Sequence, residues 1–207
     1  MQVSFIGMSN IGKSAWAQRI AASSGLTHFN CDALIEKELG DEIIHTGAKG
    51  ARNLANWMGQ PFNAGYRANS RRYLDCEKIV LENIFQQLRG QPKLSAVIDT
   101  TGSVIYADAG TLAELRNLTR IIYFEASEQH MDVMLRNYIA NPKPVIWGDL
   151  YASQANETSQ QTLERCYPLL LHERILRYKE LAHITIPFEI HKNHKMDMYE
   201  YLQGLGV

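Results

Sequence analysis

Short apolar runs that end at turn residues alternate along the chain with longer segments of helical spacing. Five such runs predict buried strands at residues 3–6, 27–30, 96–98, 121–124 and 184–188. Apolar residues that recur with a helical period predict helices over residues 13–24, 77–88, 109–118, 129–139, 163–181 and 196–202. Strands that alternate with helices are typical of parallel βαβ units, so we expect a parallel sheet with helices on both faces.

Two prolines refine this pattern. Pro187 cannot donate to a sheet ladder, which favours the edge of the sheet for the last strand. Pro168 is expected to start the long helix near residue 163 or to lie in its first turn.

Two stretches fit the alternation poorly. Residues 40–72 are rich in Gly, Asn and Arg, and residues 141–162 contain two prolines and a polar run. Long loops in compact domains tend to be lids or binding segments. We therefore predict one domain over residues 1–207, with a substrate-binding insertion at about residues 33–75 and a lid at about residues 136–162.

Composition narrows the choice of partners and compartment. A formal net charge of -1 gives no overall attraction to nucleic acid or to an anionic membrane, and no apolar run approaches the length of a membrane span, so neither partner is expected. The cysteines Cys31, Cys76 and Cys166 are far apart, which disfavours a disulfide framework or thiolate metal site. With no basic leader before a long apolar core, a cytoplasmic protein is expected, as a monomer or weak homodimer.

The strongest chemical signal follows the first predicted strand. Residues 7–14 read Gly-Met-Ser-Asn-Ile-Gly-Lys-Ser, the Gly-x4-Gly-Lys-Ser pattern of a phosphate-binding loop, between a strand and a helix. Backbone N–H groups would form an anion nest at the start of the helix. The residues expected to bind the nucleotide are Asn10, Ile11, Gly12, Lys13, Ser14 and Ala15.

Within this loop, Lys13 is expected to bridge the β and γ phosphates and Ser14 to ligate Mg²⁺. The cofactors predicted are therefore ATP and Mg²⁺. The chain has no Asn-Lys-x-Asp motif, which argues against a GTPase.

The segment that follows the second strand, Phe-Asn-Cys-Asp-Ala-Leu-Ile-Glu at residues 29–36, resembles the shikimate kinase family when taken with the phosphate loop. The resemblance implies a P-loop NTPase fold, a three-layer α/β/α arrangement around a five-stranded parallel sheet. It also implies ATP-dependent phosphorylation of a hydroxyl on a small, anionic metabolite, with shikimate as the leading candidate. The family has two aspartates here, one that organises Mg²⁺ and one that contacts the substrate hydroxyls.

In this chain those two positions are Asn30 and Asp32. An amide is a weaker partner for Mg²⁺ than a carboxylate, so metal handling is expected to differ. Asp32 can accept the hydroxyl proton or orient the hydroxyl for in-line attack, and it is predicted to be catalytic. Its alternative role is that of a helix N-cap.

Further resemblances lie downstream. Arg174 opens an Arg-x-x-x-Tyr-x-x-x-Ala stretch that is similar to a family helix whose Arg grips the substrate carboxylate. Glu77 matches a residue that orients arginines in the family, although Leu74 stands where a substrate-binding Arg is expected. Gly102 alone remains of three glycines that pack against the substrate. Asp99 ends an apolar strand and is predicted to hold Mg²⁺ through water, with a loop-start turn as its alternative.

The lid would supply cations to the transferring phosphate. Residues 143–146, Lys-Pro-Val-Ile, resemble the family's Arg-Pro-Leu-Leu, and Arg136 is predicted to be the catalytic cation, with Lys143 as the second candidate. A solvated basic face is the alternative for both residues.

The sequence leaves two alternatives to shikimate phosphorylation open. One is a kinase for another small acceptor of the gluconate or nucleoside type. The other is a nucleotide-binding protein that resembles shikimate kinase and has lost the chemistry, as Asn30, Leu74 and the missing glycines would suggest.

Overall fold

The computed structural model of the chain describes residues 1–43, 51–127, 131–193 and 195–207. Its sheet has five strands, β1 (Gln2–Ile6), β2 (Thr27–Asn30), β3 (Ala96–Asp99), β4 (Arg120–Phe124) and β5 (Ile184–Ile186), in the order β2-β3-β1-β4-β5. All four strand pairs are parallel. The predicted fold class is confirmed, and β5 lies at the sheet edge as Pro187 indicated.

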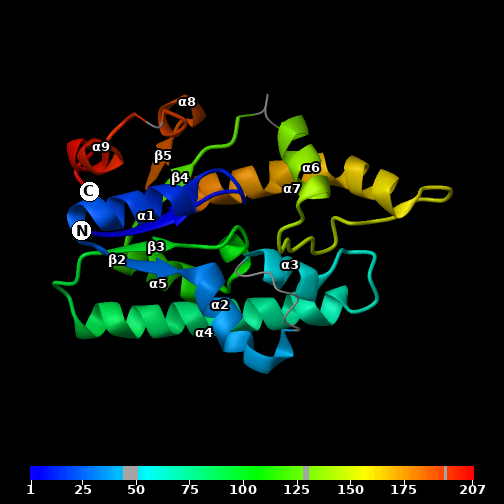
Figure 1. The fold of residues 1–207 in the computed structure, drawn as a ribbon, viewed down its shortest axis with the longest axis horizontal. Helices are drawn as coiled ribbons and strands as arrows, with labels where there is room; N and C mark the ends of the chain where they lie inside the picture. The colour runs from blue at the N-terminus through cyan, green and yellow to red at the C-terminus, as the bar shows by residue number, and fades with distance from the viewer. Residues whose placement is uncertain (44–50, 128–130, 194) are drawn as a thin grey trace.

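Helices cover both faces of the sheet. Figure 1 shows α1 (Lys13–Ser24) and α9 (Met198–Gly204) on one side, and α4 (Tyr66–Gly90) with α5 (Ala109–Leu118) on the other. Parallel strands need crossover connections, and α1, α4 and α5 lie in three of them. The strands therefore all end at the same edge, where α3 (Ala51–Met58), α6 (Met131–Ala140) and the segment 141–158 also gather.

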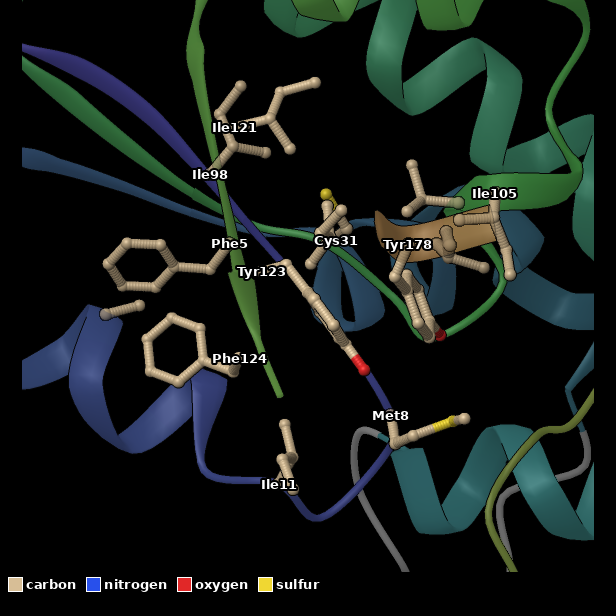
Figure 2. Packing of buried hydrophobic residues seen from close by; sticks show 14 of the residues in the cluster. Phe5, Met8, Ile11, Cys31, Ile98, Ile105, Ile121, Tyr123, Phe124 and Tyr178 are labelled. Atoms are coloured by element: carbon tan, nitrogen blue, oxygen red, sulfur yellow. The ribbon is translucent and has the colours of Figure 1, made fainter. Parts of the chain in front are cut away.

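The core separates into two layers around the central strands. Phe5 and Phe124 pack on the α1 side with ring centroids 4.9 Å apart. Tyr123, the neighbour of Phe124 on β4, points to the opposite face and stacks on Tyr178 of α7 (Ser159–Leu181) at 5.2 Å. Figure 2 shows both pairs around the sheet. Successive residues of a strand point to opposite faces, and here both faces are buried, as the near-continuous apolar runs predicted.

Two predicted helices, 13–24 and 109–118, match α1 and α5. The predicted helix 129–139 is α6 from Met131 to Ala140, and its residues 129 and 130 lie outside the described residues. The predicted helix 196–202 is α9, which begins at Met198 after its N-cap Asp197. Short helical turns complete the chain, η1 (Gly40–Glu42), η2 (Val104–Tyr106) and α8 (Phe188–His191).

The expectation of a long loop over residues 40–72 is wrong for most of that stretch. The described part contains η1, α3 and the first turns of α4, which begins at Tyr66 rather than at Glu77, and α2 (Cys31–Leu39) ends just before this stretch. Tyr66, Tyr73 and Val80 are seven residues apart and all buried, so one face of a long helix packs against the body. Residues 44–50 of the predicted insertion lie outside the described residues.

The placement of Pro168 in the first helical turn is also wrong. The helix begins at Ser159, so Pro168 lies inside it. A capping box starts the helix, in which Thr158 accepts from the backbone of Gln161 and the Gln161 side chain accepts from the backbone of Thr158. Pro168 cannot donate a backbone hydrogen bond to residue 164. Buried contacts on both sides of it, from Leu163 to Tyr178, hold the helix together.

Among the described residues, no helix combines the length and apolar character that crossing a bilayer requires.

Candidate functional site

The predicted phosphate loop contains three residues with positive φ angles. Gly7 has φ 141° and Gly12 has φ 108°, and between them Asn10 adopts φ 64°. A Cβ on Gly7 would lie 2.8 Å from the carbonyl oxygen of Phe124, so this position tolerates no side chain. Gly12 is the N-cap of α1 with no side-chain cap, which leaves the first N–H groups of the helix available to an anion.

Lys13 is folded back over this loop. Its ammonium donates to the carbonyl oxygens of Gly7 (2.9 Å) and Met8 (3.1 Å), and the residue is 6% exposed. Burial lowers the pKa of Lys13 from its ordinary value, and the charges of Asp99 and Asp32 oppose that shift. These two carboxylates therefore lie near the lysine. Asp99 ends β3, and Asp32 lies in the first turn of α2, directly after the neighbouring strand β2.

Asp99 and Ser14 fit a magnesium ion that arrives with a nucleotide. Asp99 is 4% exposed, and in the described part of the chain its Oδ1 has no hydrogen-bond partner, while Oδ2 lies 3.9 Å from His28 Nε2. Ser14 is exposed at the start of α1. No group of three or more His, Cys, Asp or Glu among the described residues forms a metal cage. Mg²⁺ usually takes one or two protein ligands and completes its shell with phosphates and water.

Asp32 lies in the first turn of α2, and the N-cap role considered for it belongs to Asn30. The Asn30 side chain accepts a hydrogen bond from the backbone N–H of Ala33 at 2.9 Å. The carboxylate of Asp32 accepts from the hydroxyl of Tyr73 on α4 at 3.2 Å. Burial raises the pKa of the Asp32 carboxyl, and the positive charge of Lys13 opposes this.

Gly102 and Arg174 are in contact. Arg174, 3% exposed on α7, donates to the carbonyl oxygen of Gly102 at 3.2 Å and to that of Ile146 at 2.9 Å. The hydroxyl of Tyr178, one turn later, donates to the same Gly102 carbonyl. A Cβ on Gly102 would lie 3.1 Å from Ser9 Oγ, so Gly102 also touches the phosphate loop. Within the described chain, the Nε of Arg174 is buried without a hydrogen-bond partner.

Glu77 binds hydroxyl groups. It is 2% exposed and accepts hydrogen bonds from Thr101 Oγ1 and from Ser103 Oγ, the latter at 3.1 Å. No hydrogen bond joins it to Arg174 in the described chain. Burial raises the pKa of Glu77 to about 7, although both hydroxyls favour the charged form. The two hydroxyl residues flank Gly102, so Glu77 holds the loop that follows β3.

A cavity of about 80 Å³ lies between the phosphate loop, α6 and α7. Its polar lining includes Ser9, Asn10, Asn137, Lys143 and Arg174. Lys143 is therefore at the site. Arg136 is exposed on α6 and does not line this cavity, so the structure does not bring it to the phosphate loop.

The structure thus brings together the predicted nucleotide residues 10–15, the two acids and the Gly102–Arg174 pair. Sequence reasoning missed the bond from Tyr73 to Asp32, the binding of Thr101 and Ser103 by Glu77, and His28 beside Asp99. His28 and Asn30 are two residues apart on β2 and share one face of the sheet. Because Asn30 pairs with Asp99 of β3, a strand-pairing argument could have placed His28 near Asp99.

A strand, a loop shaped by Gly7 and Gly12, and a helix that carries Lys13 define a fold of the P-loop class. More particularly, the chain has the fold of shikimate kinases. It is similar to shikimate kinase from Acinetobacter baumannii in complex with shikimate, with 20% identity, 89% of this chain and 81% of that chain covered, and a TM-score of 0.56.

Two other solved structures show the same fold. Shikimate kinase from Aquifex aeolicus is 15% identical over 100% of this chain and 98% of that one, with a TM-score of 0.58. That from Bacteroides thetaiotaomicron is 13% identical over 99% and 97%, with a TM-score of 0.57. No family model and no curated protein sequence matches the chain. At sequence identities of 20% and below, the similarity to these structures establishes the fold alone.

Proposed function

We propose that the protein is an ATP-dependent kinase that phosphorylates a hydroxyl group of a small metabolite. The observation that carries this proposal is the position of Lys13. It is buried against a loop shaped by glycines, near Asp99 at the end of β3 and Asp32 in the first turn of α2. A phosphate-binding loop alone would serve any nucleotide hydrolase. A second acid near the lysine, Asp32, suits an acceptor hydroxyl.

In the proposed reaction, the backbone of residues 10–15 binds the phosphates of ATP. Lys13 exchanges its bonds to the Gly7 and Met8 carbonyls for bonds to the phosphates, which stabilises the charge of the transition state. Ser14 and Asp99 would hold Mg²⁺, which neutralises phosphate charge when bound. Asp32 orients the acceptor hydroxyl and receives its proton.

The acceptor would lie between Asp32, Gly102 and Arg174. Shikimate is the leading candidate, because Asp32 and Arg174 stand at positions that resemble substrate contacts of the shikimate kinase family and the fold is that of shikimate kinases. A polyol acid such as gluconate, or a nucleoside, is the alternative acceptor. We propose Lys143, which lines the cavity, as a cation for the transferring phosphate, and Arg136 as a residue that would reach it only after the 136–162 segment moves.

The proposal is tested by measuring ADP release with ATP, Mg²⁺ and a panel of shikimate, gluconate and nucleosides. We expect one class of acceptor to stimulate release and Lys13→Ala to reduce turnover by a factor of at least about 10³. Lys93→Ala is the matched control, because Lys93 is exposed in the turn before β3. Wild-type rates in Lys13→Ala would contradict the mechanism.

A second candidate function is nucleotide binding without phosphoryl transfer. Two observations favour it: Asn30 already serves as an N-cap, and Arg174 already donates to two backbone carbonyls. Such a protein would bind ATP with Mg²⁺ in a calorimeter and release no ADP with any acceptor of the panel. We further propose that the protein, with either function, works in the cytoplasm as a monomer or weak homodimer.

A further inference from the structure

One face of α4 reaches both sides of the proposed acceptor region. Tyr73 and Glu77 are four residues apart and therefore lie one above the other on the helix. Both are buried, with 1% and 2% of their surface exposed. Tyr73 contacts Asp32 on α2, and Glu77 contacts Thr101 and Ser103 after β3. A single rigid helix thus fixes the spacing between Asp32 and the loop that contains Gly102.

In the hydrogen bond between Tyr73 and Asp32, the Tyr73 hydroxyl is the donor. Burial, together with the nearby charges of Asp32 and Glu77, raises the pKa of the Tyr73 phenol well above its ordinary value. Tyr73 therefore keeps its proton at neutral pH and can only donate to the carboxylate. Because Asn30 caps α2, the Asp32 carboxylate is not required at the helix start and is free to accept this bond.

Three other charged groups act on the Asp32 carboxylate from different elements. Lys13 attracts it from the phosphate loop, Lys143 attracts it from the segment after α6, and Asp99 repels it from β3. An aspartate has few rotamers, and a hydrogen bond from a buried side chain selects among them. Tyr73 provides that hydrogen bond from α4, at 3.2 Å from Oδ1.

We propose that Tyr73 is a positioning residue, whose hydroxyl holds the Asp32 carboxylate in the orientation that receives the acceptor's proton. This inference rests on the proposed kinase function for its catalytic consequence. The contact itself stands independently of that function. Glu77 completes the arrangement by holding Thr101 and Ser103 on the other side of the acceptor.

The decisive experiment is a ¹³C-carboxyl NMR titration of Asp32 in the wild-type protein, in Tyr73→Phe and in Tyr201→Phe. The Asp32 resonance is assigned from its loss in Asp32→Asn. Tyr73 stabilises the charged carboxylate, so its removal should move the Asp32 midpoint to higher pH. Tyr201, on α9, is the control and should leave the midpoint unchanged. An unchanged midpoint in Tyr73→Phe would overturn the inference.

Kinetics give the second readout. In Tyr73→Phe we expect kcat to fall about tenfold while the KM for ATP stays constant, because positioning of one reactant is lost and the nucleotide site is intact. The acid limb of the pH profile should move to higher pH with the NMR midpoint. If no acceptor is phosphorylated, the proposed function fails, and the NMR titration still decides the role of Tyr73.

Stability provides a check should Tyr73→Phe fold poorly. Loss of the hydroxyl leaves a desolvated carboxylate without its donor, so the variant should be less destabilised in an Asp32→Asn background, where no charge remains. An equal loss in both backgrounds would show that Tyr73 acts through packing alone, which would contradict the proposal.

Discussion

Gly7 is the residue on which the geometry of the phosphate loop depends most directly. Its φ of 141° is open to glycine and strained for other residues, and a Cβ would come within 2.8 Å of the Phe124 carbonyl. We predict that Gly7→Ala lowers the free energy of unfolding by about 1–3 kcal/mol, as strain of this kind does. Urea denaturation would measure the change.

Gly90→Ala is the matched control for this prediction. Gly90 ends α4, has no positive φ, and a Cβ there would meet nothing within 4 Å. Its replacement should change the free energy of unfolding by less than about 1 kcal/mol. Equal effects of the two alanines would show that the loop tolerates a side chain at Gly7.

The role of a single residue could be predicted where its interaction partners lie near it in the sequence. Lys13 and Ser14 could be placed from sequence because the loop that positions them is eight residues long. The partners of Asp32 and Glu77 come from other elements, 41 and 24 residues away for Tyr73 and Thr101. No local pattern encodes such pairs, because they depend on how α4 packs against α2 and the sheet.

Element boundaries show the same contrast between local and distant causes. The start of α7 was missed although its capping box, Thr158 and Gln161, is visible in the sequence. The start of α4 has no such signal, since its N-cap Gly65 makes no side-chain cap. Burial of Tyr66 and Tyr73 against the rest of the protein extends that helix, and no local sequence motif predicts such burial.

Tyr66 of α4 anchors the segment that follows α6, in addition to Arg174 of α7, which donates to the Ile146 carbonyl. The Tyr66 hydroxyl donates to the Val145 carbonyl and accepts from the Trp147 N–H, both at 2.8 Å. Val145 and Trp147 are buried, although this segment has no helix or strand. Any movement of the segment over the phosphate loop would therefore start beyond this anchor or break it.

We predict that Tyr66→Phe accelerates amide hydrogen exchange in residues 143–151 and leaves the β-strands unchanged. Two buried backbone groups lose their partner, which costs about 1–3 kcal/mol locally. Exchange measured by mass spectrometry would test this, with Tyr199→Phe on α9 as control. Equal acceleration throughout the protein would contradict a local anchor.

At the scale of the whole molecule, the sheet order assembles the site. β1, β2 and β3 bring the phosphate loop, Asp32 and Asp99 to one edge, because parallel strands all end there. The alternation of strands and helices predicted a parallel sheet, whereas the strand order β2-β3-β1-β4-β5 comes from the structure. Arg174 reaches Gly102 across 72 residues of sequence, and that pairing required the three-dimensional packing of α7.

The buried Glu77 should leave a signature in the stability of the whole molecule. Its pKa rises from an ordinary 4.5 to about 7 on folding, so the folded protein binds this proton more tightly than the unfolded chain. Between about pH 4.5 and 7 the unfolded chain loses the proton first, and the free energy of unfolding falls as pH rises. Above about pH 7 both states are charged and the dependence ends.

We predict that Glu77→Gln removes this contribution. The difference in unfolding free energy between wild type and Glu77→Gln should change by up to about 3 kcal/mol from pH 4.5 to pH 7, in favour of the variant at the higher pH. Comparing the two proteins cancels the opposite trend from His183 and His191, whose pKa values are lowered by burial. Urea titrations at several pH values would measure the difference, and a value that is constant with pH would show that Glu77 titrates normally.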